Sequence, residues 1–224
     1  MAYILSIETA TTNCSVSLSK NGKVIILKED YDKNYSHAER LHVYIEDVLK
    51  QAKISQNDLS AIAVSKGPGS YTGLRIGVSA AKGLSYALGI SLISISTLEA
   101  LAHQVKIDRG VIVSMLDARR KEVYAAVFDA NYNQVRKTQA DILDESAFID
   151  YLERGIVHFI GNGVEKTKTI INHTNAVFVE NKLPSANEMG NLAYIKYKKG
   201  DLEDVAYFEP YYLKDFVALT PSKK

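Results

Sequence analysis

SKGPGSYTGLRIG, residues 65–77, is the stretch of this chain that decides its fold. It holds four glycines and one proline, and it follows the β-rich apolar run AIAVS at 61–65. A helix of small and apolar residues is expected directly after it, from Thr72 to Leu88, with Gly89 as its stop. A glycine-rich turn that ends a strand and opens a helix is the usual cradle for a phosphate group.

The loop nevertheless departs from both simple phosphate-binding motifs. A P-loop reads G-x-x-x-x-G-K-[ST], but the sixth position from Gly67 is Thr72 and no Gly-Lys pair follows. The dinucleotide fingerprint reads G-x-G-x-x-G, whereas Gly67, Gly69 and Gly73 are spaced one residue too far apart. We therefore favour a strand-to-helix turn that needs close packing and positive φ, and keep phosphate binding as the alternative.

The helix after the loop carries more apolar surface than one sheet needs. At 100° per residue, Ser79, Lys82 and Tyr86 fall within about 40° of Arg75. The other positions, with one serine among them, are apolar or very small and span about 220°, where a helix on one sheet needs about 100°. Either the helix expected at 36–52 covers the surplus, or the surplus is a surface for a partner.

Both halves of the chain show the same order of elements, strand-strand-strand-helix-strand-helix-strand-helix. In the first half, Asn21-Gly22 predicts a hairpin, and Ser36 with Glu39 forms a capping box that opens the helix ending near Ala52. In the second half, one helix is expected at 145–153. Another is expected to begin at the capping box of Ser185 and Glu188 and to end near Lys199. The pattern predicts an α/β protein of two lobes, 1–106 and 107–224, with mixed sheets and a cleft between them.

Composition sets limits on the kind of protein. The formal net charge is +1, so the chain lacks the overall basic field of a protein that binds nucleic acid alone. We expect the local basic clusters at 119–121, 196–199 and 223–224 to be solvated faces. Cys14 is the single cysteine and, in the alternating run TTNCSVSL, is expected to be a small buried hydrophobe. MAYILSIETA has no basic start and reaches an acid within ten residues, so we expect neither signal peptide nor membrane span and a cytoplasmic location.

No pattern in the chain predicts a catalytic or metal site. His37 and His42 are five residues apart, which places them about 140° apart on a helix, so they do not converge as an H-x-x-x-H pair would. G-x-S-x-G, the nucleophile elbow of hydrolases, is absent. We therefore assign no catalytic residue and no metal ligand.

Four stretches resemble one bacterial family. They are similar to the TsaB family, whose older name is YeaZ, and they read ILSIETATTNCSVSL (4–18), SHAERLH (36–42), GPGSYTGLRIG (67–77) and DARRKEVYAAVF (117–128). The resemblance covers nearly all of the first half and continues through Gly161–Gly163 and PYYLK at 210–214. The loop is its most specific part, because the family writes GPGSFTGLRIG and this chain has Tyr71 in place of the Phe.

The resemblance implies an actin-like ATPase fold (ASKHA, RNase H-like) with two duplicated lobes. It implies a role in forming threonylcarbamoyladenosine beside the anticodon of tRNAs, where the related TsaD transfers the threonylcarbamoyl group. TsaB resembles TsaD but lacks its H-x-x-x-H metal motif, and acts as its partner together with the ATPase TsaE. It follows that the isolated chain is expected to catalyse nothing, to hold no cofactor, and to meet tRNA through the complex; a nucleotide at the interface of that complex stays open.

The resemblance also implies which residues matter. In the family, the two helices of the first lobe pair with the matching helices of TsaD or, when TsaB is alone, of a second copy. Carried over to this chain, the interface falls on one helix and comprises Tyr71, Arg75, Ile76, Ser79, Ala80, Gly83 and Ala87.

One departure bears on chemistry. The family and its fold relatives usually have Asp after the first strand, where the carboxylate positions a metal-bound phosphate, and this chain has Glu8. Thr9 and Thr11 could still hydrogen-bond a phosphate, which would make Glu8, Thr9 and Thr11 a vestigial phosphate side, but we favour capping of the turn as the role of the two threonines. A small ATPase or phosphotransferase of the same fold is the alternative function. The glycoprotease label once attached to the family is disfavoured by the missing metal ligands.

Overall fold

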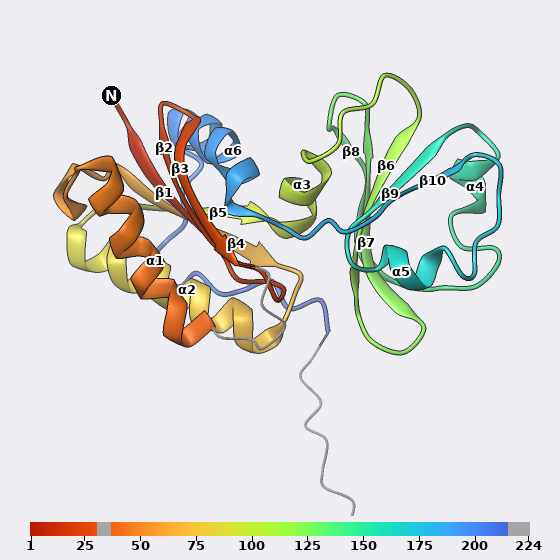
Figure 1. The fold of residues 1–224 in the computed structure, drawn as a ribbon, viewed down its shortest axis with the longest axis horizontal. Coiled ribbons are helices and arrows are strands. Elements are labelled where there is room, and N and C mark those ends of the chain that lie inside the picture. The colour runs from red at the N-terminus through yellow and green to blue at the C-terminus, as the bar shows by residue number, and fades with distance from the viewer. Residues whose placement is uncertain (31–36, 215–224) are drawn as a thin grey trace, which may run out of the picture.

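The computed structural model describes residues 1–30 and 37–214 and shows two five-stranded mixed sheets with flanking helices (Figure 1). The first sheet has the order β3-β2-β1-β4-β5, and the second has the order β10-β9-β6-β7-β8. In each sheet three consecutive strands form antiparallel pairs, and the two later strands run parallel to the first of them. The two sheets therefore repeat one topology, which confirms the duplicated α/β architecture expected from the order of elements.

The elements of the two lobes follow each other in the same sequence. The first lobe contains β1 (Tyr3–Glu8), β2 (Cys14–Lys20), β3 (Lys23–Asp30), α1 (His37–Ala52), a short 3-10 turn (Gln56–Asp58), β4 (Ala61–Gly67), α2 (Tyr71–Leu88), β5 (Ser91–Ser96) and α3 (Thr97–Ala102). The second contains β6 (Val111–Asp117), β7 (Glu122–Asp129), β8 (Gln134–Ile142), α4 (Ile149–Leu152), β9 (Val157–Ile160), α5 (Val164–Thr167), β10 (Ala176–Val179) and α6 (Ala186–Lys199).

Local sequence signals predicted the turns and helices of the first lobe better than those of the second. Asn21 and Gly22 take positive φ at the β2–β3 turn, as the hairpin signal requires. The helix expected at 145–153 is reduced to α4, because Phe148 has a left-handed φ of 63° and breaks the helical run. Ser185 caps α6 through the Asn187 amide, but the Glu188 carboxylate bonds the side chains of Asn187 and Gln104 instead of completing a capping box. Ser36, the other predicted cap, lies outside the described residues.

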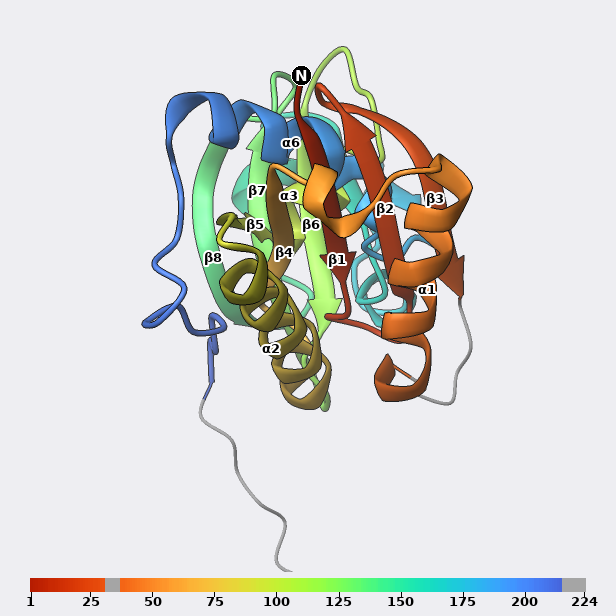
Figure 2. The same cartoon turned by 90° about the vertical axis from the view of Figure 1, so that its left-hand side faces the viewer.

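Helices cover the first sheet on both faces (Figures 1 and 2). Helices α1 and α2 lie on one face, and α6, from the end of the chain, covers the other. Ser17 donates to the carbonyl of Ala186 at 2.7 Å, and the amide of Ala186 donates to Ser15 at 3.0 Å. These buried bonds attach α6 to β2 across about 170 residues of sequence. The division into 1–106 and 107–224 stays a prediction, and α6 from the second segment completes the lobe built by the first.

The last described residues return along α2. We name residues 201–214 the C-terminal strap. Its Glu203 amide donates to the Leu92 carbonyl at 2.9 Å, which adds one bridge to the edge strand β5. The Lys82 ammonium donates to the carbonyls of Ala206 and Phe208, at 3.2 and 2.8 Å. The strap therefore closes one side of α2, and within the described residues no helix is both long and apolar enough to cross a bilayer.

Candidate subunit interface and the loop beneath it

The turn between β1 and β2 is packed directly against the glycine loop. The Ser70 amide donates to the Ala10 carbonyl at 2.7 Å, and the Thr9 hydroxyl donates to the Gly73 carbonyl at 2.8 Å. The Ser70 hydroxyl in turn accepts from the Gly73 amide and caps α2. Two of the backbone amides at this helix start, those of Ser70 and Gly73, are therefore used by the protein itself.

The loop glycines are required because the two backbones touch. A Cβ on Gly73 would lie 2.1 Å from the Thr9 carbonyl oxygen, and one on Gly77 would lie 2.2 Å from the Thr9 hydroxyl. A Cβ on Gly69 would lie 2.6 Å from the Ala10 carbonyl oxygen. The glycines thus let α2 seat on the β1–β2 turn, as expected for a close-packed strand-to-helix turn.

Glu8 is fully buried at the end of β1 and holds the same turn. Its carboxyl accepts from the Ala10 amide at 2.6 Å, with the Ser65 hydroxyl beside it and Thr97 bonded to Ser65 at 2.6 Å. Burial raises the pKa of Glu8 to about 7, although hydrogen bonds from Ala10, Ser65 and Thr9 act in the opposite direction. The carboxyl is therefore a buried, partly protonated member of the turn.

The other candidate phosphate and metal residues have structural partners too. The Thr11 hydroxyl, 5% exposed, accepts from the Asn13 amide at 3.3 Å. His37 is buried with a ring nitrogen 2.7 Å from the Thr11 carbonyl oxygen, and burial lowers its pKa, whereas His42 is exposed. In the part of the chain that the structure describes, no three His, Cys, Asp or Glu side chains gather in a way that could hold a metal ion. A phosphate role for Glu8, Thr9 and Thr11 stays a prediction.

Five of the seven predicted interface residues form one strip along α2. Ser79, Gly83 and Ala87 are exposed, while Ile76 and Ala80 are half-buried. At 100° per residue the five span an arc of about 100° on the side away from the sheet. Ile76 and Ala80 pack against the core that α1 also covers, so α1 covers part of the surplus apolar arc and leaves the rest open.

The remaining two predicted residues face the strap. The Tyr71 ring lies 4.9 Å from the ring of Tyr212, and the Arg75 guanidinium lies 4.7 Å from the Tyr71 centroid. These contacts place Tyr71 and Arg75 at the border between the open strip and the strap.

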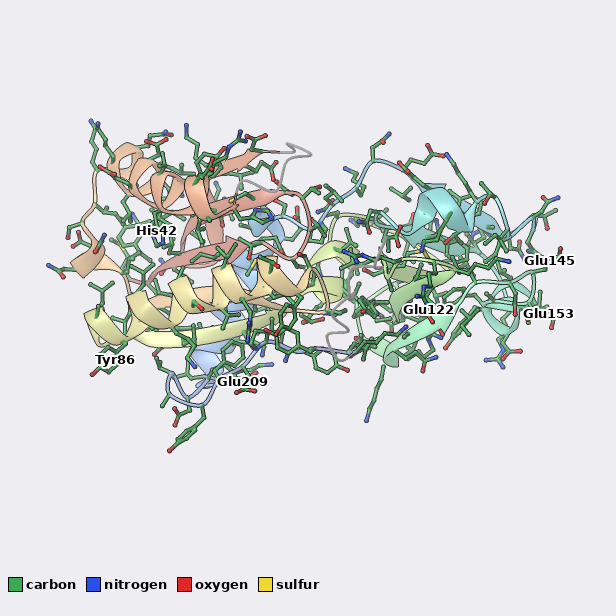
Figure 3. All side chains as sticks on the ribbon, turned by 90° about the horizontal axis from the view of Figure 1, so that it is seen from below. His42, Tyr86, Glu122, Glu145, Glu153 and Glu209 are labelled. Atoms are coloured by element: carbon green, nitrogen blue, oxygen red, sulfur yellow. The ribbon has the colours of Figure 1, made fainter. Side chains whose placement is uncertain are left out.

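Helix α1 contacts α2 and carries exposed residues of its own. Val43 is 53% exposed on α1, and Tyr86 is 84% exposed near the end of α2. Figure 3 shows the two helices side by side with His42 and Tyr86 labelled. We define the α1–α2 surface as His42, Val43, Ser79, Gly83, Tyr86 and Ala87.

Comparison with known proteins identifies the family. A family model described as TsaD, tRNA N6-adenosine threonylcarbamoyltransferase, matches residues 32–221. The tRNA threonylcarbamoyladenosine biosynthesis protein TsaB of Escherichia coli is 30% identical over 96% of both chains. This chain belongs to the TsaB family. TsaB of Bacillus subtilis is 38% identical over 56% of this chain and 54% of its own length.

The fold is also that of a solved TsaB-family structure. YeaZ from Pseudomonas aeruginosa superposes with a TM-score of 0.84 at 24% identity, covering 95% of this chain and 100% of that chain. Together with the duplicated sheets, this likeness confirms the actin-like α/β fold class.

Sequence reasoning missed the C-terminal strap of this TsaB-family chain. The available signal was Lys82, one of the two cations on α2, the other being Arg75. Its ammonium donates to two backbone carbonyls of the strap, and a helical wheel cannot show which distant carbonyls a lysine binds.

We expect Gly73→Ala to destabilise the chain by about 1–3 kcal/mol, because its Cβ would overlap the Thr9 carbonyl in a packed site. The matched control is Gly83→Ala, whose new Cβ would meet no described atom within 4 Å outside the helix's own nearby backbone, and which should gain about 0.5–1 kcal/mol of helix stability. Urea unfolding of both variants measures the difference. Equal stabilities would show that the close approach at Gly73 carries no energy.

Glu8 should make stability fall as pH rises. Its folded pKa of about 7 lies above the value of 4.5 in the unfolded chain, so the folded state binds more protons between these values. Stability from this group is complete below about pH 4.5 and is lost towards pH 7, by roughly 3 kcal/mol in all. In Glu8→Gln, which keeps an acceptor for the Ala10 amide but cannot ionise, this loss should vanish. Unfolding free energies at pH 5 and pH 8 test it; an identical pH dependence in both proteins would refute the assignment.

Proposed function

We propose that this chain is a non-catalytic subunit of the machinery that forms threonylcarbamoyladenosine in tRNA. The names of its TsaB relatives supply the pathway. The family model carries the name of the transferase, but this chain has no H-x-x-x-H pair with which to hold a catalytic metal ion. The proposal therefore assigns the transfer step to a TsaD-like protein, with a TsaE-like ATPase in the same complex.

The observation that carries the proposal is the open α1–α2 surface. Among the described residues, no atom outside the helix's own nearby backbone lies within 4 Å of the position of a Cβ on Gly83, and Ala87 beside it is exposed. Small residues let two helix axes approach to about 8 Å, and exposed Val43 and Tyr86 supply the apolar area typical of an interface core. The TsaD-like partner takes this surface, and a second copy of the chain takes it when the partner is absent.

The rest of the proposal follows from charge and burial. With a net charge of +1, the chain gains little affinity for tRNA by itself, so tRNA is met within the complex, in the cytoplasm. The buried Glu8 and the Ala10 carbonyl bonded to Ser70 leave the β1–β2 turn engaged in internal contacts. This weighs against the alternative of a small ATPase.

The isolated chain should hydrolyse ATP no faster than the uncatalysed background. The reason is that Glu8 is buried and no P-loop lysine is present in the glycine loop. A steady-state phosphate-release assay measures this. Turnover of about one per second or faster that disappears in Glu8→Ala would establish the ATPase instead.

Gly83→Arg should abolish pairing with the TsaD-like protein while the monomer keeps its fold. The new side chain meets open space in this chain, but at the interface it would bury a charge without a partner, at a cost of several kcal/mol. That cost is enough to break a contact of micromolar affinity. Co-elution on size exclusion, with circular dichroism as the fold control, measures both.

The matched control is Ile195→Arg, which places the same charge on exposed α6, on the opposite face of the sheet. We expect it to pair normally. Ala80→Arg is a poorer probe, because Ala80 is half-buried against the core and a loss of pairing would be confounded with a loss of fold. Normal pairing of Gly83→Arg would place the interface elsewhere.

A further inference from the structure

The β6–β7 turn is the counterpart, in the second lobe, of the β1–β2 turn. Both turns leave the sheet at the carboxyl end of its first strand, where α/β sheets bind their ligands. In the first lobe the turn is buried under the start of α2. In the second lobe Arg119, Arg120 and Lys121 are all exposed.

The backbone of this turn is unusual for arginine. Arg119 and Arg120 have φ of 65° and 50°, so two consecutive non-glycine residues are left-handed. Hairpin turns of this kind strongly prefer Asn and Gly, since each left-handed residue with a side chain costs about 1 kcal/mol or more. Such strain, when kept, is typical of functional positions.

The turn is also held rigidly from below. The Lys166 ammonium donates to the Asp117 carboxylate at 2.7 Å and to the carbonyls of Arg120 and Glu122 at 3.1 and 2.7 Å. The Arg119 amide donates to the same Asp117 carboxylate at 2.6 Å. The arginine side chains therefore project from a fixed frame and lose little backbone freedom on binding a ligand.

The nearby acids do not neutralise these cations. Asp117 is paired with Lys166, and Glu122 forms an ion pair with Lys214 of the strap. Among residues 1–30 and 37–214, no ion pair joins Arg119, Arg120 or Lys121 to a carboxylate. Three adjacent positive charges thus stand open on a rigid turn of an otherwise nearly neutral protein.

We infer that Arg119, Arg120 and Lys121 bind the phosphate backbone of RNA. Guanidinium groups bind phosphate oxygens bidentately, and three neighbouring cations on a projecting turn suit a chain of repeated phosphates better than one enclosed phosphate. The inference rests on the proposed function, in which that RNA is the tRNA of the complex. It replaces the expectation that this cluster is merely a solvated face.

The test removes the charges of the two arginines without damaging the turn. The double variant Arg119→Asn/Arg120→Gly installs the residues that a left-handed turn prefers, so the fold should be at least as stable. The control Lys198→Gln/Lys199→Gln removes the same charge from the exposed end of α6. Affinity for unmodified tRNA is measured over 50–200 mM salt, for the chain alone and mixed with the TsaD-like protein.

We expect the turn variant to flatten the slope of log affinity against log salt by about 1.5, which is a roughly 30-fold loss of affinity at about 0.1 M salt. The control should change neither quantity by more than a small fraction of this. Equal losses in both variants, or no loss in the turn variant, would overturn the inference. So would absence of tRNA binding by the mixture with the TsaD-like protein, or a loss of affinity for a free mononucleotide without a loss for tRNA. Co-elution of the wild-type chain with the TsaD-like protein is scored separately, so a failure of the proposed partnership is distinguishable from a failure of the turn.

Discussion

The close contact between the β1–β2 turn and the first turns of α2 is the constraint on which the first lobe depends. Side chains at positions 69, 73 and 77 would overlap this turn. The space they would need is occupied by the carbonyls of Thr9 and Ala10 and by the Thr9 hydroxyl. Glycine at those positions lets α2 approach the carboxyl end of β1, and the buried Glu8 carboxyl fixes the turn from the sheet side. The result is a helix positioned by backbone contact, with its opposite side left open.

Duplication gives the second lobe the same topology, but its corresponding turn meets different surroundings. After β9 the chain forms only α5, four residues long, where the first lobe has the eighteen residues of α2. Among residues 1–30 and 37–214, therefore, no helix comparable to α2 covers the β6–β7 turn, and Arg119 and Arg120 are exposed. One fold thus yields a closed turn beneath a helix surface in one lobe and an open cationic turn in the other.

Sequence patterns predicted the parts of this structure that depend on neighbours along the chain. Alternation gave the strands, Asn21-Gly22 the hairpin, and the loop glycines the close-packed start of α2. Sequence patterns did not predict the attachment of α6 to β2, because it depends on hydrogen bonds between Ser15, Ser17 and Ala186, which lie about 170 residues apart in the sequence. They did not predict the path of the strap either, because it depends on contacts between distant residues, such as Lys82 with the carbonyls of Ala206 and Phe208 and Tyr71 with Tyr212. The family resemblance placed the seven predicted interface residues on one helix, but their division between an open strip and a strap-facing border required the position of Tyr212.

The glycines of α2 supply a physical reason to expect a partner. Each glycine within a helix costs about 1 kcal/mol relative to alanine, and at Gly73 and Gly77 this cost is offset by the contact with Thr9 that a Cβ would forbid. Gly83 has no such compensation among the described residues, since the space around it is open. A helix approaching from another subunit would supply the missing compensation, because it could pack against the bare backbone at Gly83 as closely as the β1–β2 turn packs at Gly73. Both ends of α2 would then be closely packed against a backbone or helix, by this chain at the first turn and by the partner at the fourth.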